Sequence, residues 1–159
     1  MNNLLEKALP QKPPMRLIDR IIELNNTQAI CEAFIEKNHI FYDSNIDGLA
    51  PWIGIEMMAQ TAAVFVYGHQ NKIDGVENRG LKEAKIAFLM SVRQFHTTIS
   101  HIPAGSTLII IANSIFLDEE TGVFECQILQ DSKAVAEARL SAYQPSLDKL
   151  TTLLAGCSK

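Results

Sequence analysis

The sequence lacks the long apolar runs and the excess of positive charge that mark two large classes of protein. No uninterrupted apolar run approaches the roughly 18 residues that a membrane-spanning helix needs. The first residues contain no basic segment followed by an apolar one, as a signal peptide would. The net charge of -4 argues against a nucleic-acid partner. We therefore expect a cytoplasmic protein with neither a membrane nor a nucleic acid as its partner.

Paired cysteines and the common catalytic and metal-binding motifs are also missing. Cys31, Cys126 and Cys157 are widely separated and form no C-x-x-C pair, so reduced thiols are expected rather than disulfides. No H-x-x-x-H or H-E-x-x-H spacing occurs, and neither a G-x-S-x-G elbow nor a P-loop is present. We expect no metal and no cofactor.

What the chain does contain is enough apolar sequence for one core. It has 159 residues, of which 47% are hydrophobic, and it shows no internal repeat or linker. This length and composition predict a single domain over residues 1–159 that folds without disulfide or metal support.

Alternation of apolar and polar residues predicts strands on both sides of one apolar segment. After a proline-containing loop at residues 9–14, the expected strands are 15–24, 29–36, 85–98, 106–116, 123–130 and 133–143. Residues 85–98 can be one strand or a bent pair, and a short helix can follow at 146–155. Residues 37–51 and 69–83 are expected to be irregular connections. The two regions of strand are thus segregated around a single central segment.

That central segment, residues 52–69, is expected to be a helix. It is apolar on nearly every side, with Pro51 suited to its first turn and Gly68 to its end. A helix that is apolar all round must be buried. Packing therefore predicts an α+β hotdog fold, in which a curved antiparallel sheet wraps around one long central helix. The edges of such a sheet are often covered by pairing with a second subunit.

Glu56 is the residue of this helix that most suggests a function. A carboxylate in an apolar helix must be paired, hydrogen-bonded or facing a cavity. Gln60 lies four residues on and on the same face, so it can bond Glu56 or a ligand. A structural role is the alternative, in which Glu56 caps backbone amides or pairs with a buried arginine such as Arg20 or Arg93.

Backbone N–H groups near Trp52, Ile53 and Gly54, at the start of the helix, are candidates to bind a substrate carbonyl oxygen. Close packing of the helix on the sheet explains Gly54 equally well. His39 precedes the helix and can reach Glu56, although a surface role is the simpler reading for any of the four histidines. The basic residues of the stretch 72–93 can dock an acidic carrier protein, or can simply form a solvated surface.

Three stretches resemble a known family. Leu9-Pro10-Gln11-Lys12-Pro13-Pro14 leads into Leu17-Ile18-Asp19-Arg20, Ile55-Glu56-Met57-Met58-Ala59-Gln60 forms a helix motif, and Pro103-Ala104-Gly105-Ser106-Thr107-Leu108 forms a turn. Together they are similar to the 3-hydroxyacyl-(acyl-carrier-protein) dehydratases of the hotdog superfamily, and most of all to the dehydratase-like proteins of aryl-polyene-type biosynthesis clusters. The resemblance runs over about residues 8–143, and the helix motif is its most specific part.

The resemblance implies dehydration of a 3-hydroxyacyl thioester to the 2-enoyl thioester, with an acyl carrier protein or coenzyme A thioester as the partner. Glu56 then corresponds to the family's catalytic carboxylate and Gln60 to its neighbour. The family's second catalytic group, a loop histidine, is replaced here by Asn45, and Gln11 replaces a histidine in the opening motif. Asparagine cannot act as a general base.

Because the family's loop histidine is replaced, three functions are open for this chain. The chain can be a dehydratase in which His39 or a partner's histidine supplies the base, in a homodimer or in a heterodimer with a paralogous hotdog subunit. It can be a non-catalytic or half-site subunit that supports a paralogous dehydratase. It can also be a hotdog acyl thioesterase, which would release a free thiol.

Overall fold

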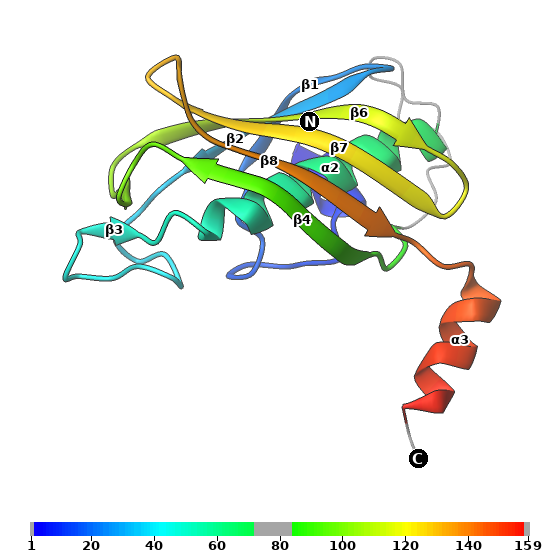
Figure 1. Ribbon diagram of the computed structural model, residues 1–159. Helices are drawn as coiled ribbons and strands as arrows, with labels where there is room; N and C mark the ends of the chain where they lie inside the picture. The colour runs from blue at the N-terminus through cyan, green and yellow to red at the C-terminus, as the bar shows by residue number, and fades with distance from the viewer. Residues whose placement is uncertain (1, 72–83, 158–159) are drawn as a thin grey trace.

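The structure is a computed structural model that describes residues 2–71 and 84–157 (Figure 1). Its elements in chain order are α1 (Asn2–Ala8), β1 (Arg20–Leu24), β2 (Gln28–Phe34), β3 (Gly48–Leu49), α2 (Ile53–Gln70), β4 (Phe88–Thr97), β5 (Ile102–Pro103), β6 (Thr107–Leu117), β7 (Thr121–Gln130), β8 (Lys133–Tyr143) and α3 (Leu147–Gly156). Among the described residues, no helix is long and apolar enough to cross a bilayer.

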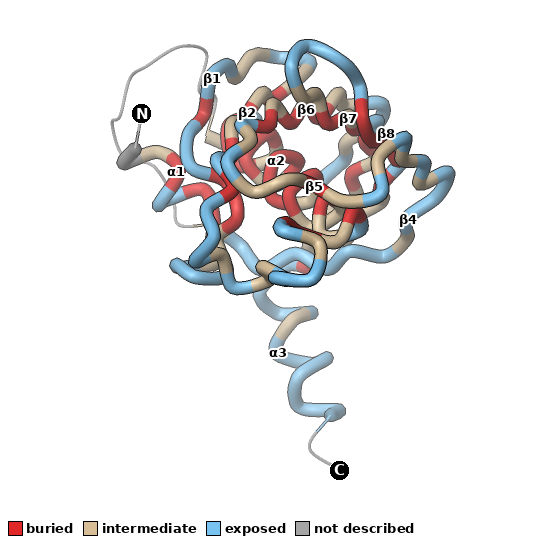
Figure 2. Tube along the Cα trace, turned by 90° about the vertical axis from the view of Figure 1, so that its left-hand side faces the viewer, coloured by how far each residue is buried: buried red, intermediate tan, exposed pale blue. Residues whose placement is uncertain are grey.

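Six of the strands form one antiparallel sheet in the order β1-β2-β6-β7-β8-β4, and β3 pairs with β5 in a separate small ribbon. Seen end-on, the large sheet curves around α2, while α1 lies at one side of the helix (Figure 2). The predicted α+β hotdog architecture is therefore confirmed, with α2 shifted by only one residue at each end from the expected range.

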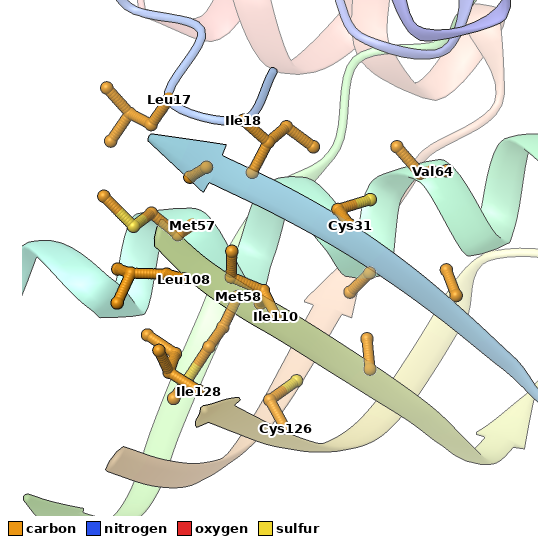
Figure 3. Close-up of a cluster of buried hydrophobic side chains, with 14 of the residues drawn as sticks. Leu17, Ile18, Cys31, Met57, Met58, Val64, Leu108, Ile110, Cys126 and Ile128 are labelled. Atoms are coloured by element: carbon orange, nitrogen blue, oxygen red, sulfur yellow. The ribbon is translucent and has the colours of Figure 1, made fainter. Parts of the chain in front are cut away.

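The core lies between α2 and the concave face of the sheet (Figure 3). Met57, Met58 and Val64 of the helix are fully buried. They face alternate residues of β2, β6 and β7, which include Cys31, Leu108, Ile110, Cys126 and Ile128. Period-two alternation in the strands thus supplies one wall of the core, and the apolar helix supplies the other.

The two core cysteines behave as small apolar residues. Burial raises the pKa of the Cys31 thiol and of the Cys126 thiol to about 12. Both side chains therefore stay protonated and unreactive at neutral pH. Cys157 is exposed after the end of α3.

Strand β1 is shorter than the sequence predicts. Residues 15–19 were expected to belong to it, but only Arg20–Leu24 forms the strand. The reason is that the backbone of Met15 and Leu17 is hydrogen-bonded by the side chain of Gln60 instead of by a neighbouring strand. The preceding segment contains α1, a helix that the sequence analysis did not anticipate, which buries Leu5 and Ala8 against the core.

Strand β4 forms one edge of the sheet and is irregular. Its pairing with β8 has two register shifts, and Gln94 adopts a positive φ of 54° between the residues of the second shift. Several of its apolar side chains, Phe88, Leu89, Met90 and Val92, are exposed. An exposed apolar edge of this kind is suited to pairing with another chain.

Helix α3 leaves the body of the molecule after β8 (Figure 1). It has no buried residue. An exposed ion pair between Lys149 and Glu120 connects it to the turn between β6 and β7. Helix α3 therefore contributes little to the core.

Candidate active site

Helix α2 begins with a tight turn that follows Pro51. The N–H groups of Ile53 and Gly54 donate to the carbonyl oxygens of Ala50 and Pro51, at 3.1 and 3.0 Å. Trp52, at the N-cap position, is 65% exposed. This turn places Glu56 in the first turn of the helix, where the helix dipole favours a negative charge.

Gln60 holds Glu56 in position. The Nε2 atom of Gln60 donates to Oε1 of Glu56 at 3.0 Å and to the carbonyl oxygen of Met15 at 2.9 Å. The Oε1 atom of Gln60 accepts the N–H of Leu17 at 2.8 Å. Because Gln60 is 1% exposed, these bonds lie in a protein environment in which they are hard to replace by water. The amide therefore fixes one carboxylate oxygen of Glu56 and leaves the other available.

Glu56 opens onto a cavity of about 150 Å³. The cavity follows one face of α2 from Glu56 to Gln70, with the small side chains Ala59 and Ala63 forming its floor. Its walls come from the segment after α1, from β4 and the residues before it, and from the turn between β6 and β7. A half-buried carboxylate at one end of an elongated, largely apolar cavity can act as an acid or base on a bound acyl chain.

His39 does not share this cavity. Its Nδ1 atom accepts the N–H of Phe41 at 3.2 Å, and its Nε2 atom is buried without a hydrogen-bond partner. Burial lowers the pKa of His39, against an opposing effect of the nearby Asp19 charge. His39 is not among the described residues that line the Glu56 cavity, and none of those residues is a histidine.

Asn45 does not contribute to the Glu56 cavity either. It is exposed in the loop before β3, where its backbone N–H and its Nδ2 atom both donate to Oδ1 of Asp43. Asn45 therefore stabilises a local turn and is not among the described residues that line the cavity. The sequence alignment that placed it at the family histidine gives no catalytic geometry here.

The expected free N–H groups at the start of α2 are not found at Ile53 and Gly54, because both donate within the turn. Trp52, Ile53 and Gly54 are absent from the described lining of the cavity. A Cβ atom at Gly54 would lie 2.6 Å from Cδ1 of Ile128, so this glycine allows α2 to approach β7 closely. Of the two explanations for Gly54, the structure supports packing.

The structural alternative for Glu56 is not supported either. Arg20 is on the surface and forms a bidentate ion pair with Glu32, at 2.7 and 2.9 Å. Arg93 is exposed on β4. Within the described ranges, no group of three or more histidine, cysteine or acidic side chains gathers in a way that could hold a metal ion.

Two cavity residues were missed by the sequence analysis. The hydroxyl of Tyr67 and the Oε1 atom of Gln11 are both buried without a hydrogen-bond partner, and both residues line the Glu56 cavity. The position of Tyr67 was recognisable, since it lies about three helical turns after Glu56 and so on the same face. Gln11 was noted only for the histidine that it replaces. Much of the basic stretch, residues 72–83, lies outside the described residues.

A protein-family model described as ApeP dehydratase, in the ApeP-like family, matches residues 4–155. The chain belongs to the ApeP-like dehydratase family. Two curated relatives carry the name 3-hydroxyacyl-(acyl-carrier-protein) dehydratase FabZ. The one from Acidiphilium cryptum is 38% identical over 54% of this chain and 50% of its own length. The one from Streptococcus sanguinis is 25% identical over 87% of this chain and 94% of its own length.

Solved structures agree with this assignment. A chain of the dehydratase heterocomplex ApeI:P from Xenorhabdus doucetiae matches this chain with a TM-score of 0.81 and 25% identity. The match covers 94% of this chain and 96% of that one. The PaaI protein from the phenylacetic acid degradation operon of Escherichia coli matches with a TM-score of 0.56 and 16% identity, over 78% and 81% of the two chains. The second match supports the fold alone.

Proposed function

We propose that this ApeP-like protein is one subunit of a hotdog heterodimer that dehydrates a carrier-bound 3-hydroxyacyl thioester. The observation that carries the proposal is a carboxylate held by Gln60 at the end of a largely apolar cavity, with no histidine among the described residues of that cavity. One half of an acid–base pair is thus in place, and we assign the other half to a partner chain.

In the proposed step, a base on the partner subunit removes the proton from C2 of the acyl group. The electron pair of that C–H bond forms the C2=C3 double bond, and the C3–O bond breaks. The carboxylic acid of Glu56 donates its proton to the departing hydroxyl, which leaves as water. A positioned acid of this kind contributes about 10²- to 10⁴-fold to the rate.

Two observations support a second hotdog subunit as the partner. The edge strand β4 exposes Phe88, Leu89, Met90 and Val92, which would be covered by an adjoining subunit. The neighbour from Xenorhabdus doucetiae is itself named as a heterocomplex of two dehydratase chains. The relatives are named as 3-hydroxyacyl-(acyl-carrier-protein) dehydratases, which supports a 3-hydroxyacyl thioester on an acyl carrier protein as the substrate. A coenzyme A thioester is the alternative carrier that we propose.

The test compares the chain alone with its co-purified complex with a paralogous hotdog subunit. Dehydration of 3-hydroxyacyl thioesters is followed by mass spectrometry as loss of water. We expect turnover by the complex and none by the chain alone, and a fall of at least about 100-fold in the complex that carries Glu56→Gln. Glu36→Gln, which changes an exposed carboxylate away from the cavity, is the matched control.

Full turnover by the Glu56→Gln complex would assign this chain a supporting rather than a catalytic role. A supporting role is consistent with the same observation, that no histidine is found among the described residues of the cavity. Turnover by the chain alone would refute the half-site arrangement. Release of free thiol in place of a water-loss product would instead identify a thioesterase.

A further inference from the structure

Helix α3 is amphipathic, although none of its residues is buried. At 3.6 residues per turn, its leucines lie on one side of the helix and form a leucine stripe. The stripe consists of Leu147, Leu150, Leu153 and Leu154. Leu147 is 78% exposed, and Leu154 is 57% exposed. An apolar stripe on a surface helix normally faces a core, but within the described chain no core covers this one.

The helix turns its polar side toward its own chain. The Nζ atom of Lys149 lies 2.8 Å from both carboxylate oxygens of Glu120, in the turn between β6 and β7. Tyr143 and four residues of α3 line a groove, and three of those four, Asp148, Lys149 and Thr152, are polar. A helix that packed on its own sheet would place its leucines there instead. The leucine stripe is therefore open to a second molecule.

Helix α3 is also too short to be stable without packing. It has ten residues, and helices of this length are marginal in water on their own. Its ion pair with Glu120 is exposed to solvent, and pairs of that kind contribute little. A surface that covers the leucine stripe would supply the packing that the rest of this chain does not.

The leucine stripe begins beside the edge strand β4. Tyr143, the last residue of β8, pairs with Phe88, the first residue of β4, and Leu147 follows Tyr143 by four residues. In Figure 1, α3 descends from the end of the sheet at which β4 begins. Met90, near the start of β4, is 64% exposed. One neighbouring subunit can therefore cover both the start of β4 and the leucine stripe.

Size and charge favour such a subunit over other occupants. A stable interface buries about 800 Å² on each partner, which is more than four leucine side chains provide. The stripe is thus suited to extend a larger interface and not to hold two copies of α3 together by itself. A helix that binds a membrane surface is typically rich in lysine and arginine. The charged residues of α3 are one lysine and one aspartate.

We propose that the leucine stripe of α3 packs against the hotdog subunit that adjoins β4, so that α3 is an arm that extends the heterodimer interface. This inference rests on the proposed function, because that proposal supplies the second subunit. The partner surface that receives the arm is apolar and lies beside the start of β4. Removal of the arm weakens the complex and leaves the fold of this chain intact.

The experiment measures how fast the two subunits separate. The complex of this chain with a paralogous hotdog subunit is co-purified and mixed with an excess of fluorescently labelled wild-type chain. Entry of the label into the complex is followed by size-exclusion chromatography. We expect a chain truncated after Ser146 to leave the complex at least about tenfold faster than the full chain, because the loss of buried apolar surface raises the dissociation rate. An unchanged exchange rate would overturn the proposal.

Paired variants test the leucine stripe itself. Leu150→Gln combined with Leu154→Gln removes two leucines and keeps the helix propensity, and it should also speed exchange about tenfold. Asp148→Gln combined with Thr152→Gln changes the opposite side of α3 and should exchange at the wild-type rate. Both should keep the urea midpoint of the chain alone, because no residue of α3 is buried. Equal acceleration in the two variants would refute docking through the leucines.

Turnover separates this inference from the proposed function. None of the described residues of the Glu56 cavity belongs to α3, so the α3 variants should keep the wild-type kcat once the complex is saturated. Faster exchange of the leucine variant would uphold the inference even if Glu56→Gln left turnover unchanged. Equal exchange rates together with loss of turnover in Glu56→Gln would sink the inference and leave the proposed function standing.

Two controls on the chain alone address the other occupants. The first tests binding to vesicles of phosphatidylglycerol by flotation, and the second tests self-association by analytical ultracentrifugation. We expect neither to depend on the leucine stripe. Vesicle binding or self-association that is lost in the leucine variant, while subunit exchange is unchanged, would assign the stripe to a membrane or to a second copy and refute the proposal.

Discussion

Gln60 connects three parts of the molecule through one amide. It bonds the carboxylate of Glu56 and the backbone of Met15 and Leu17, and it is almost completely buried. The geometry of the candidate acid therefore depends on a loop that is more than forty residues away in sequence. A change at Gln60 should affect both the fold and the site.

Gln60→Leu should lower the free energy of unfolding by about 2 kcal/mol, because the Leu17 N–H would be left buried and unpaired. Urea denaturation of the purified chain measures the change. Gln70→Leu is the control, since Gln70 is exposed at the end of the same helix and its side chain bonds the half-buried Gln144. Equal midpoints for the two variants would show that the Gln60 network is not stabilising.

His39 gives the molecule a stability that depends on pH. Burial lowers the pKa of His39 in the folded chain below the value of 6.5 that it has when unfolded. The unfolded chain therefore binds the proton more tightly, and the free energy of unfolding should fall as pH drops through 6.5. Above that pH both states carry a neutral ring, and the contribution of His39 to stability is constant.

His39→Gln should reduce the fall in the free energy of unfolding at acidic pH. Near pH 5.5 the free energy of unfolding should therefore depend less steeply on pH in the variant than in the wild type. Near pH 7.5 the two proteins should show the same slope. The measurement is a series of urea titrations between these pH values. His96→Gln, which alters an exposed histidine on β4, should reproduce the wild-type slope. A slope that is insensitive to His39 would contradict the assigned burial effect.

The sequence predicted the local part of the site and not its long-range part. Glu56 and Gln60 are four residues apart on one helix, so their contact follows from helical geometry alone. The bonds from Gln60 to Met15 and Leu17, and the separation of His39 from the cavity, depend on tertiary packing. No spacing in the sequence encodes those distances.

At the scale of elements, the strands were predicted correctly where apolar and polar residues alternate over many positions. Strand β8 has the predicted bounds, Lys133–Tyr143, and β6 and β7 differ from their expected ranges by at most two residues. The two-residue strands β3 and β5 were missed because no periodicity can be recognised over two positions. Helix α1 is only seven residues long, and its stability comes from packing rather than from its own sequence.

The ribbon of β3 and β5 depends on a close approach that only glycine permits. A Cβ atom at Gly48 would lie 2.1 Å from the carbonyl oxygen of Ile102, which is backbone and cannot move aside. Gly48→Ala should therefore lower the free energy of unfolding by about 2 to 3 kcal/mol.

Gly156→Ala is the matched control for this change. A Cβ atom there would meet no other atom within 4 Å, and alanine favours a helix, so stability should be unchanged or slightly higher. Thermal unfolding followed by circular dichroism compares the two variants. If Gly48→Ala unfolded at the wild-type temperature, the close approach of β3 to β5 would be disproved.

At the scale of the whole molecule, the core is independent of α3. Truncation after Ser146 should change the free energy of unfolding by less than about 1 kcal/mol, because α3 has no buried residue and its ion pair, Lys149 with Glu120, is exposed. Urea titration of the truncated chain gives the value. A large loss of stability would mean that α3 packs on the sheet in solution.

The burial of α2 within a sheet formed mostly by later residues has a consequence for biosynthesis. The helix ends at Gln70, while β8, the last strand of the sheet, ends at Tyr143. At about 5 to 20 residues per second, a ribosome takes on the order of 4 to 15 s to make the intervening chain. For that time α2 has been made without β6, β7 and β8, although β2, which also covers it, is already present. The nascent chain therefore exposes an aggregation-prone segment before it can fold.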